Sequence, residues 1–114
     1  MSTTNPSVIT DRVLQEVLAE RIRQDERWGV QSHPDGTGMN YQRHLAEEER
    51  AACEAAFRSG RGTWRHVMAE EIAEANAEKD PAKLRAELLQ VAAVAVAWVE
   101  AIDRRVARSQ AVGS

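Results

Sequence analysis

Four residues on two neighbouring stretches of this sequence have the types and spacing of a metal site. Glu87 and Gln90 are the only polar residues between positions 87 and 99, a stretch otherwise made of Leu, Val, Ala and Trp. A carboxylate buried without a partner costs several kcal/mol or changes its pKa strongly, so such a Glu usually meets a cation, a donor or a metal ion. Glu71 and Glu74 repeat the same three-residue spacing, which places each pair on one face of its helix. Because oxygen ligands suit hard cations, the pattern predicts a site for Mg²⁺, with Mn²⁺ as a substitute.

Two neighbouring carboxylates are expected to lie outside this set of direct ligands. At 100° per residue, Glu70 points further out than Glu71, and Glu78 returns to the same side two turns after Glu71. The alternatives are a solvated face for the Glu-rich segment and an arginine partner for Glu87. A di-iron site of the Glu-x-x-His kind is excluded, because no Glu stands three residues before any of the three histidines.

The elements that must position these residues are helices. Strand-like alternation and hairpin dipeptides are absent, and Ala, Glu, Leu and Arg dominate. Thr63 is a plausible N-cap, Asp80 and Pro81 form a second helix start, and residues 59–62 are a glycine-rich stop. The tight connection at Asp80 favours antiparallel packing of the last two helices. We expect an all-α chain with helices over residues 7–27, 41–58, 64–79 and 81–108.

Length and composition bound the class of protein. We expect one domain over residues 1–114, with tails at 1–6 and 109–114 that look frayed. Fifteen basic against 18 acidic residues give a net charge of −3, with no basic block for polymeric nucleic acid. The longest apolar run has nine residues, well short of the roughly 18 that span a membrane. The lone Cys53 and the absence of a signal-like N-terminus favour a cytoplasmic protein.

Two further features concern assembly and access. The last helix is apolar nearly all the way round, which predicts burial among several neighbours and a homodimer or homotetramer. The connection over residues 29–40 contains several glycines and a proline, and it is the only long loop, so it is the segment expected to fold over a ligand.

The carboxylate pattern resembles the signature of the MazG-like superfamily of all-α nucleoside triphosphate pyrophosphohydrolases. That signature is Glu-Glu-x-x-Glu, about a dozen residues, then Glu-x-x-Asp. Here it reads Glu70-Glu71-Ile72-Ala73-Glu74, twelve residues, then Glu87-Leu88-Leu89-Gln90. The segment over residues 20–29, ERIRQDERWG, also looks like the opening of phage and bacterial MazG-like proteins, some of which are dATP/dGTP diphosphohydrolases. Together the two stretches cover most of residues 16–100.

The resemblance implies a four-helix MazG-like bundle completed by homo-oligomerisation. It also implies Mg²⁺-dependent hydrolysis of a (d)NTP to the monophosphate and pyrophosphate, with catalytic and metal-binding roles for Glu71, Glu74 and Glu87. Gln90 stands where the family has Asp, so the site loses one negative charge and Gln90 cannot act as a base. The alternative is a nucleotide-binding or regulatory protein with weak or no catalysis. A helical interaction module without a small ligand is a third possibility.

A nucleotide would need contacts beyond the metal. Glu20, Gln24 and Trp28 are spaced four residues apart on one helix face, where Trp28 offers a stacking surface and Gln24 an amide for a base edge. A purine deoxynucleotide is the expected ligand. The alternative without a ligand places Trp28 in the core and Gln24 in solvent. Further candidates are a second wall at Trp64, phosphate partners at Lys79 and Lys83 or at Arg21 and Arg23, and loop residues His33 and Asp35.

Overall fold

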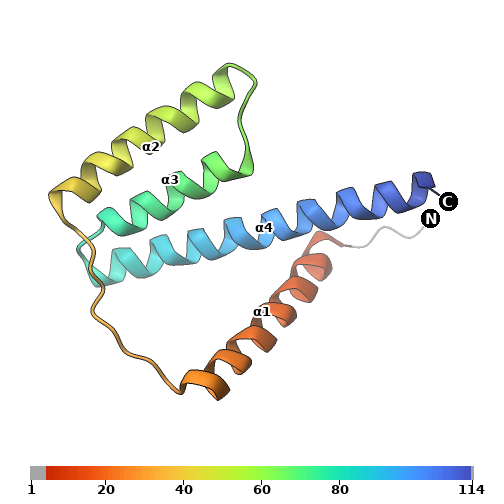
Figure 1. Ribbon diagram of the computed structural model, residues 1–114, viewed down its shortest axis with the longest axis horizontal. Coiled ribbons are helices and arrows are strands. Elements are labelled where there is room, and N and C mark those ends of the chain that lie inside the picture. Colours follow the sequence, from red (N-terminus) through yellow and green to blue (C-terminus); the bar gives the residue numbers. More distant parts are fainter. Residues whose placement is uncertain (1–4, 114) are drawn as a thin grey trace. The chain divides into compact units, whose positions relative to one another are not determined.

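The chain is all-helical in the computed structural model, which describes residues 5–113. No strand occurs among these residues, which confirms the predicted fold class. None of the described helices is both long enough and apolar enough to cross a membrane. The helices are α1 (Pro6–Trp28), α2 (Asn40–Arg58), α3 (Trp64–Ala77) and α4 (Pro81–Gly113), drawn in Figure 1.

Local side-chain caps explain where three of the helices begin. The Asn5 side chain accepts a hydrogen bond from the Ser7 N–H at 2.9 Å, just before Pro6. Thr63 accepts from the His66 N–H at 3.3 Å and is the N-cap of α3, as predicted. Asp80 Oδ2 accepts from the Lys83 N–H at 3.0 Å, directly before Pro81. The predicted starts of the last two helices are therefore confirmed.

The ends of α3 and α4 differ from prediction. The predicted third helix runs to residue 79, but α3 stops at Ala77 because Glu78 has extended backbone angles. The predicted fourth helix ends near residue 108, with a frayed tail beyond it. Instead α4 continues to Gly113, because no residue between 109 and 112 breaks a helix. At the other end, Asn5 caps and Pro6 begins α1, and the rest of the predicted N-terminal tail lies outside the described residues.

The chain forms two compact units. The first unit contains residues up to 34 together with residues from 96 onward, and the second unit contains residues 35–95. In the first unit, Thr10 of α1 donates a hydrogen bond to the Glu100 carboxylate of α4 at 3.0 Å, and Val13 and Val96 are buried. The predicted single domain stays a prediction.

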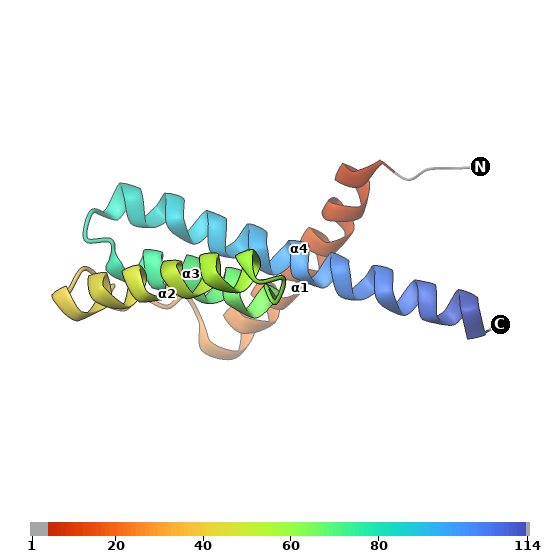
Figure 2. The ribbon, with the colours of Figure 1, turned by 90° about the horizontal axis from the view of Figure 1, so that it is seen from above.

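The second unit holds the sequence signature. Helices α2 and α3 run antiparallel and in contact, and the first half of α4 runs back along α3 (Figures 1 and 2). Small side chains fill its interior, which lets the helix backbones approach closely. The buried apolar residues of this unit are Ala46, Cys53, Ala73, Ala75 and Leu84.

Candidate metal centre

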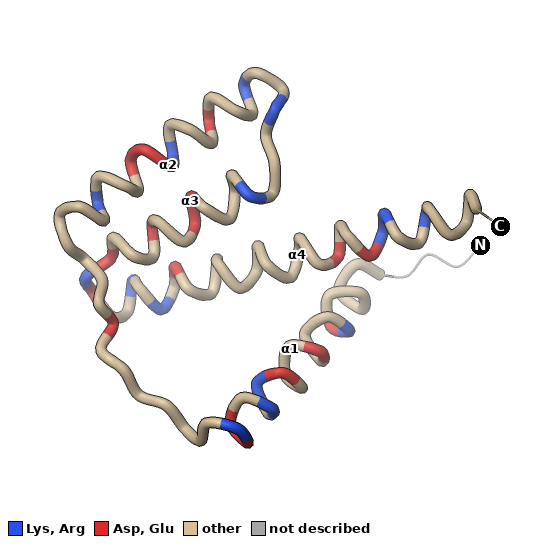
Figure 3. Tube along the Cα trace, in the orientation of Figure 1, with Lys and Arg blue, Asp and Glu red and all other residues tan. Residues whose placement is uncertain are grey.

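Three glutamates predicted as metal ligands meet in the second unit. Glu71 and Glu74 come from α3 and Glu87 comes from α4, and each offers a carboxylate oxygen within 4.8 Å of the others. The spacing of i and i+3 puts the two α3 residues on one helix face, and the antiparallel return of α4 brings Glu87 opposite them. Figure 3 shows acidic positions on these facing stretches and an uncharged middle of α4. The three side chains are half-buried.

Two oxygens of this acidic cluster are buried without any hydrogen-bond partner. They are Glu71 Oε2 and Glu87 Oε2. Buried polar atoms in folded proteins almost always have a partner, so two unpaired oxygens in one cluster are suited to coordinate a cation. The predicted alternative of an arginine partner for Glu87 is wrong for the described residues, since no ion pair reaches it.

The only cation that pairs with the cluster among residues 5–113 is too weakly placed to neutralise it. Arg50 Nε of α2 lies 3.9 Å from Glu74 Oε1, and the Arg50 side chain is 53% exposed. Exposed pairs of this kind contribute about 0–1 kcal/mol. Two unit charges about 5 Å apart repel by about 3 kcal/mol at an effective dielectric constant of about 20. The repulsion among three carboxylates therefore exceeds what Arg50 can offset.

The same environment raises the pKa of two members of the cluster. Burial raises the pKa of Glu71 above its ordinary value, and the charges of Glu87 and Glu70 add to the effect. Burial also raises the pKa of Glu74, as do Glu71 and its neighbours, whereas Arg50 lowers it. Both carboxyls thus hold protons more tightly than a solvated Glu, because burial and neighbouring negative charges outweigh the effect of Arg50.

The two residues predicted to surround the ligands act on groups outside the set of ligands. The charge of Glu70 acts on the thiol of Cys53, which is buried on α2. Burial, together with Glu70, raises the pKa of Cys53 to about 11, so the thiol stays protonated. Glu78 accepts from the Lys79 and Asp80 N–H groups at 3.1 and 3.0 Å and thereby forms the turn between α3 and α4.

Gln90 lies one turn after Glu87 on α4 and is exposed. Its role as the fourth ligand stays a prediction.

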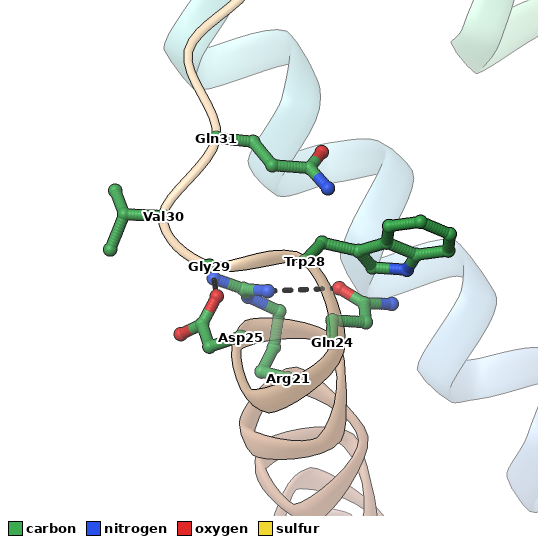
Figure 4. Close-up of a pocket in the computed structure, with 7 residues that line it drawn as sticks. All are labelled: Arg21, Gln24, Asp25, Trp28, Gly29, Val30 and Gln31. Carbon is green, nitrogen blue, oxygen red and sulfur yellow. Dashed lines mark hydrogen bonds and ion pairs between the residues drawn. The ribbon is translucent and has the colours of Figure 1, made fainter.

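Of the three residues predicted to bind the base, two line a pocket in the first unit and the third forms an ion pair. Gln24 and Trp28 line a pocket of about 400 Å³ at the end of α1, shown in Figure 4. Their polar neighbours are already engaged, since Arg21 donates to Gln24 at 2.9 Å and pairs with Asp25 at 3.1 Å. Trp28 is 61% exposed, not in the core. Glu20 is absent from the pocket lining and pairs with Arg23 at 2.7 Å.

The remaining predicted contacts are not members of the acidic cluster. Trp64 lines a pocket of about 320 Å³ with Phe57, Gly62 and Val67, where α2 connects to α3. Lys79 and Lys83 are exposed in the turn and first turn of α4. His33 and Asp35 are also exposed. Their contacts with a nucleotide stay predictions.

Two residues of the second unit with notable contacts were not predicted from the sequence. Arg50 carries no local signal, because only the packing of α2 on α3 brings it to Glu74. Gln42 is the one buried polar residue among the described ones, at 8% exposure. Its signal was available, since a Gln three residues after a helix N-cap commonly folds back onto the cap.

Comparison of the chain with models of protein families, with curated proteins and with solved structures finds no match in any of the three. The likeness to the MazG-like superfamily therefore rests on the two sequence stretches and remains an expectation.

Proposed function

We propose that the protein is a Mg²⁺-dependent nucleoside triphosphate pyrophosphohydrolase that converts a (d)NTP to the monophosphate and pyrophosphate. The observation that carries this proposal is the acidic cluster, with Glu71 Oε2 and Glu87 Oε2 buried and unpaired. An all-oxygen donor set with three negative charges fits a hard divalent cation, and the two unpaired oxygens have free coordination capacity for one.

The three glutamates of the acidic cluster would act by binding the metal ion and holding it beside the phosphates. Glu71, Glu74 and Glu87 would hold Mg²⁺, with Mn²⁺ as a substitute. When bound, Mg²⁺ neutralises phosphate oxygens and makes a water molecule more acidic. Without a cation, the three carboxylates repel a triphosphate, so binding of a nucleotide must depend on the metal. The exposed Lys79 and Lys83 are the proposed phosphate partners nearest in sequence to Glu87.

Release of pyrophosphate tests the enzyme proposal directly. Purified protein is incubated with a panel of ribo- and deoxynucleoside triphosphates and Mg²⁺ or Mn²⁺, and pyrophosphate is converted to phosphate for detection. We expect turnover with at least one purine deoxynucleotide and none in EDTA. Folded protein without turnover on any member of the panel contradicts the enzyme proposal.

A second candidate is a nucleotide-binding or regulatory protein with little catalysis, and the observation that favours it is Gln90. A neutral amide in the fourth position leaves the site with one negative charge fewer than the resembled signature. Calorimetry separates the two candidates. Metal-dependent binding of a nonhydrolysable triphosphate, combined with no pyrophosphate release from the natural one, favours the binding protein.

We further propose that a second copy of the chain covers apolar surface of the second unit. Tyr41 and Leu45 of α2 and Ile72 of α3 line one groove of about 410 Å³, and they are 60%, 47% and 43% exposed. A contiguous exposed apolar patch is uncommon on a monomer and typical of an interface. Sedimentation equilibrium should show a dimer or tetramer, and Ile72→Lys should shift it toward monomer.

A further inference from the structure

A short segment ahead of α2 ties the turn between α3 and α4 in place. We call residues 36–39 the strap. The Gly38 N–H donates to Asn76 O at 2.9 Å, and the Thr37 hydroxyl donates to Glu78 O at 2.6 Å. The last carbonyls of a helix have no partner within the helix and need one from elsewhere. The strap supplies it from about 40 residues earlier in the chain, so it caps α3 at its C-terminal end.

Gln42 holds the strap at both ends. Its side-chain carbonyl accepts from the Met39 N–H at 2.8 Å, and its amide donates to Gly36 O at 3.0 Å. At 8% exposure, Gln42 is shielded from water that would compete for these bonds. The shape of the strap is thus fixed by a single buried side chain of α2.

The fit between strap and turn leaves no space for a side chain. Gly38 has a φ of +85°, and a Cβ there would lie 2.7 Å from Lys79 Cβ and 2.9 Å from Lys79 Cα. Gly60 also has a positive φ, of +77°, but a Cβ there would meet nothing within 4 Å. An alanine at either position is strained in the backbone, whereas only an alanine at position 38 pushes the strap away from Lys79.

The turn sets how the ligands of the acidic cluster face each other. Glu74 precedes Glu78 by four residues, and Glu87 follows Asp80 by seven, so both lie within about two helical turns of the strapped segment. A slip of one residue between α3 and α4 moves a ligand by about 1.5 Å, and a metal site tolerates only about 0.5 Å. Whatever fixes the turn therefore fixes the geometry of the cluster.

We propose that Gln42, acting through the strap, is a positioning residue for the divalent cation at Glu71, Glu74 and Glu87. The inference rests on the proposed metal site and adds to it a set of residues that touch neither metal nor substrate. Gln42 fixes the conformation of the strap through its two hydrogen bonds. The strap in turn caps α3 and holds the turn between α3 and α4, and this turn keeps Glu87 in register with α3.

The test compares Gly38→Ala and Gln42→Leu with the matched control Gly60→Ala. For each full-length variant we measure the Mn²⁺ dissociation constant by calorimetry, the melting temperature in EDTA and hydrogen exchange of the amides over residues 76–84. We expect Gly38→Ala and Gln42→Leu to bind Mn²⁺ at least about tenfold more weakly and to exchange faster over 76–84. Gly60→Ala should lose thermal stability through its strained φ but keep its Mn²⁺ affinity within about twofold.

The outcomes separate this inference from the proposed function. Folded Gly38→Ala and Gln42→Leu proteins that bind Mn²⁺ like the wild type overturn the positioning role. Equal weakening in Gly60→Ala also overturns it, because general destabilisation would then explain the loss. Gln42→Glu keeps the acceptor for the Met39 N–H and should recover part of the affinity lost in Gln42→Leu.

A wild-type protein that binds no Mn²⁺ overturns the proposed metal site and, with it, the positioning of a cation. Hydrogen exchange then still decides whether the strap holds the turn. Unchanged exchange over 76–84 in Gly38→Ala and Gln42→Leu contradicts that role as well.

Discussion

The acidic cluster and the pocket at the end of α1 are both candidate ligand sites, and they differ in whether their polar atoms already have partners. In the cluster, like charges face each other and two buried oxygens stay unpaired. In the pocket, Arg21 bonds to Gln24 and Asp25, and Trp28 has the guanidinium of Arg27, which is not a lining residue, 4.8 Å from its ring centre. A cavity of about 400 Å³ whose polar groups are already paired is therefore weaker evidence for a ligand than a cluster of carboxylates with unpaired buried oxygens.

The largest expected effect comes from removing one charge of the cluster. Glu87→Gln and Glu71→Gln should each weaken Mn²⁺ binding by about 100-fold, or about 2.7 kcal/mol, because a charged ligand becomes a neutral one. The same variants should melt at a higher temperature than wild type in EDTA, since they relieve repulsion. Calorimetry and thermal melting measure the two effects. Glu47→Gln, an exposed position on α2, is the control and should change neither.

Opposite signs for metal affinity and metal-free stability are the expected behaviour of a cation site built from carboxylates that repel one another. If Glu87→Gln lowers stability in EDTA, the carboxylate is held by partners within the protein, and the contrast with the α1 pocket is wrong.

The next effect concerns the fourth position of the signature. Gln90→Asp adds a negative charge one turn from Glu87 and should tighten Mn²⁺ binding by about tenfold, with a rise in pyrophosphate release. Gln90→Asn keeps the amide with a shorter side chain and should do neither. A Gln90→Asp protein with unchanged affinity and activity would place residue 90 outside the site.

The raised pKa values of Glu71 and Glu74 predict how stability depends on pH without metal. A folded-state pKa above the unfolded value of about 4.5 means that the folded protein binds more protons, so stability falls as pH rises through the folded pKa. The stabilising contribution of these two groups is fully present below about pH 4.5. Melting in EDTA across pH 4.5–8 should show the decline, and Glu71→Gln should flatten it. Saturating Mg²⁺ should reverse it, because protons compete with the metal for the carboxylates. A decline that survives in Glu71→Gln assigns it to other groups.

The smallest effect is expected in the α1 pocket. Trp28→Ala should leave Mn²⁺ affinity within about twofold of wild type, because the lining of the pocket that contains Trp28 includes no residue of the acidic cluster. Triphosphate binding should change equally little, since the polar groups beside Trp28 are engaged with each other. A loss of triphosphate affinity of tenfold or more would instead support the sequence-based prediction that Trp28 stacks on the base.

Some features of the fold and of the acidic cluster could be predicted from the sequence, and others could not. Helix starts at Thr63 and Asp80 depend on the side chain of one residue and its nearest backbone, so they were predictable. The end of α4 was not, because a run without breakers continues or stops according to its surroundings. The i, i+3 spacing predicted that Glu71 and Glu74 share a face of α3, and the structure brings them together with Glu87 of α4.

The sequence by itself determined where the last two helices begin, the short connection at Asp80 and which side of its helix each of Glu71, Glu74 and Glu87 occupies, because each of these follows from short-range periodicity and capping. Tertiary structure alone decided that the three carboxylates lack an effective cation and that Arg50 reaches only Glu74. It alone placed the strap against a turn some 40 residues away. These contacts join segments far apart in the chain, and no local pattern of residues encodes which distant segment fills a given space.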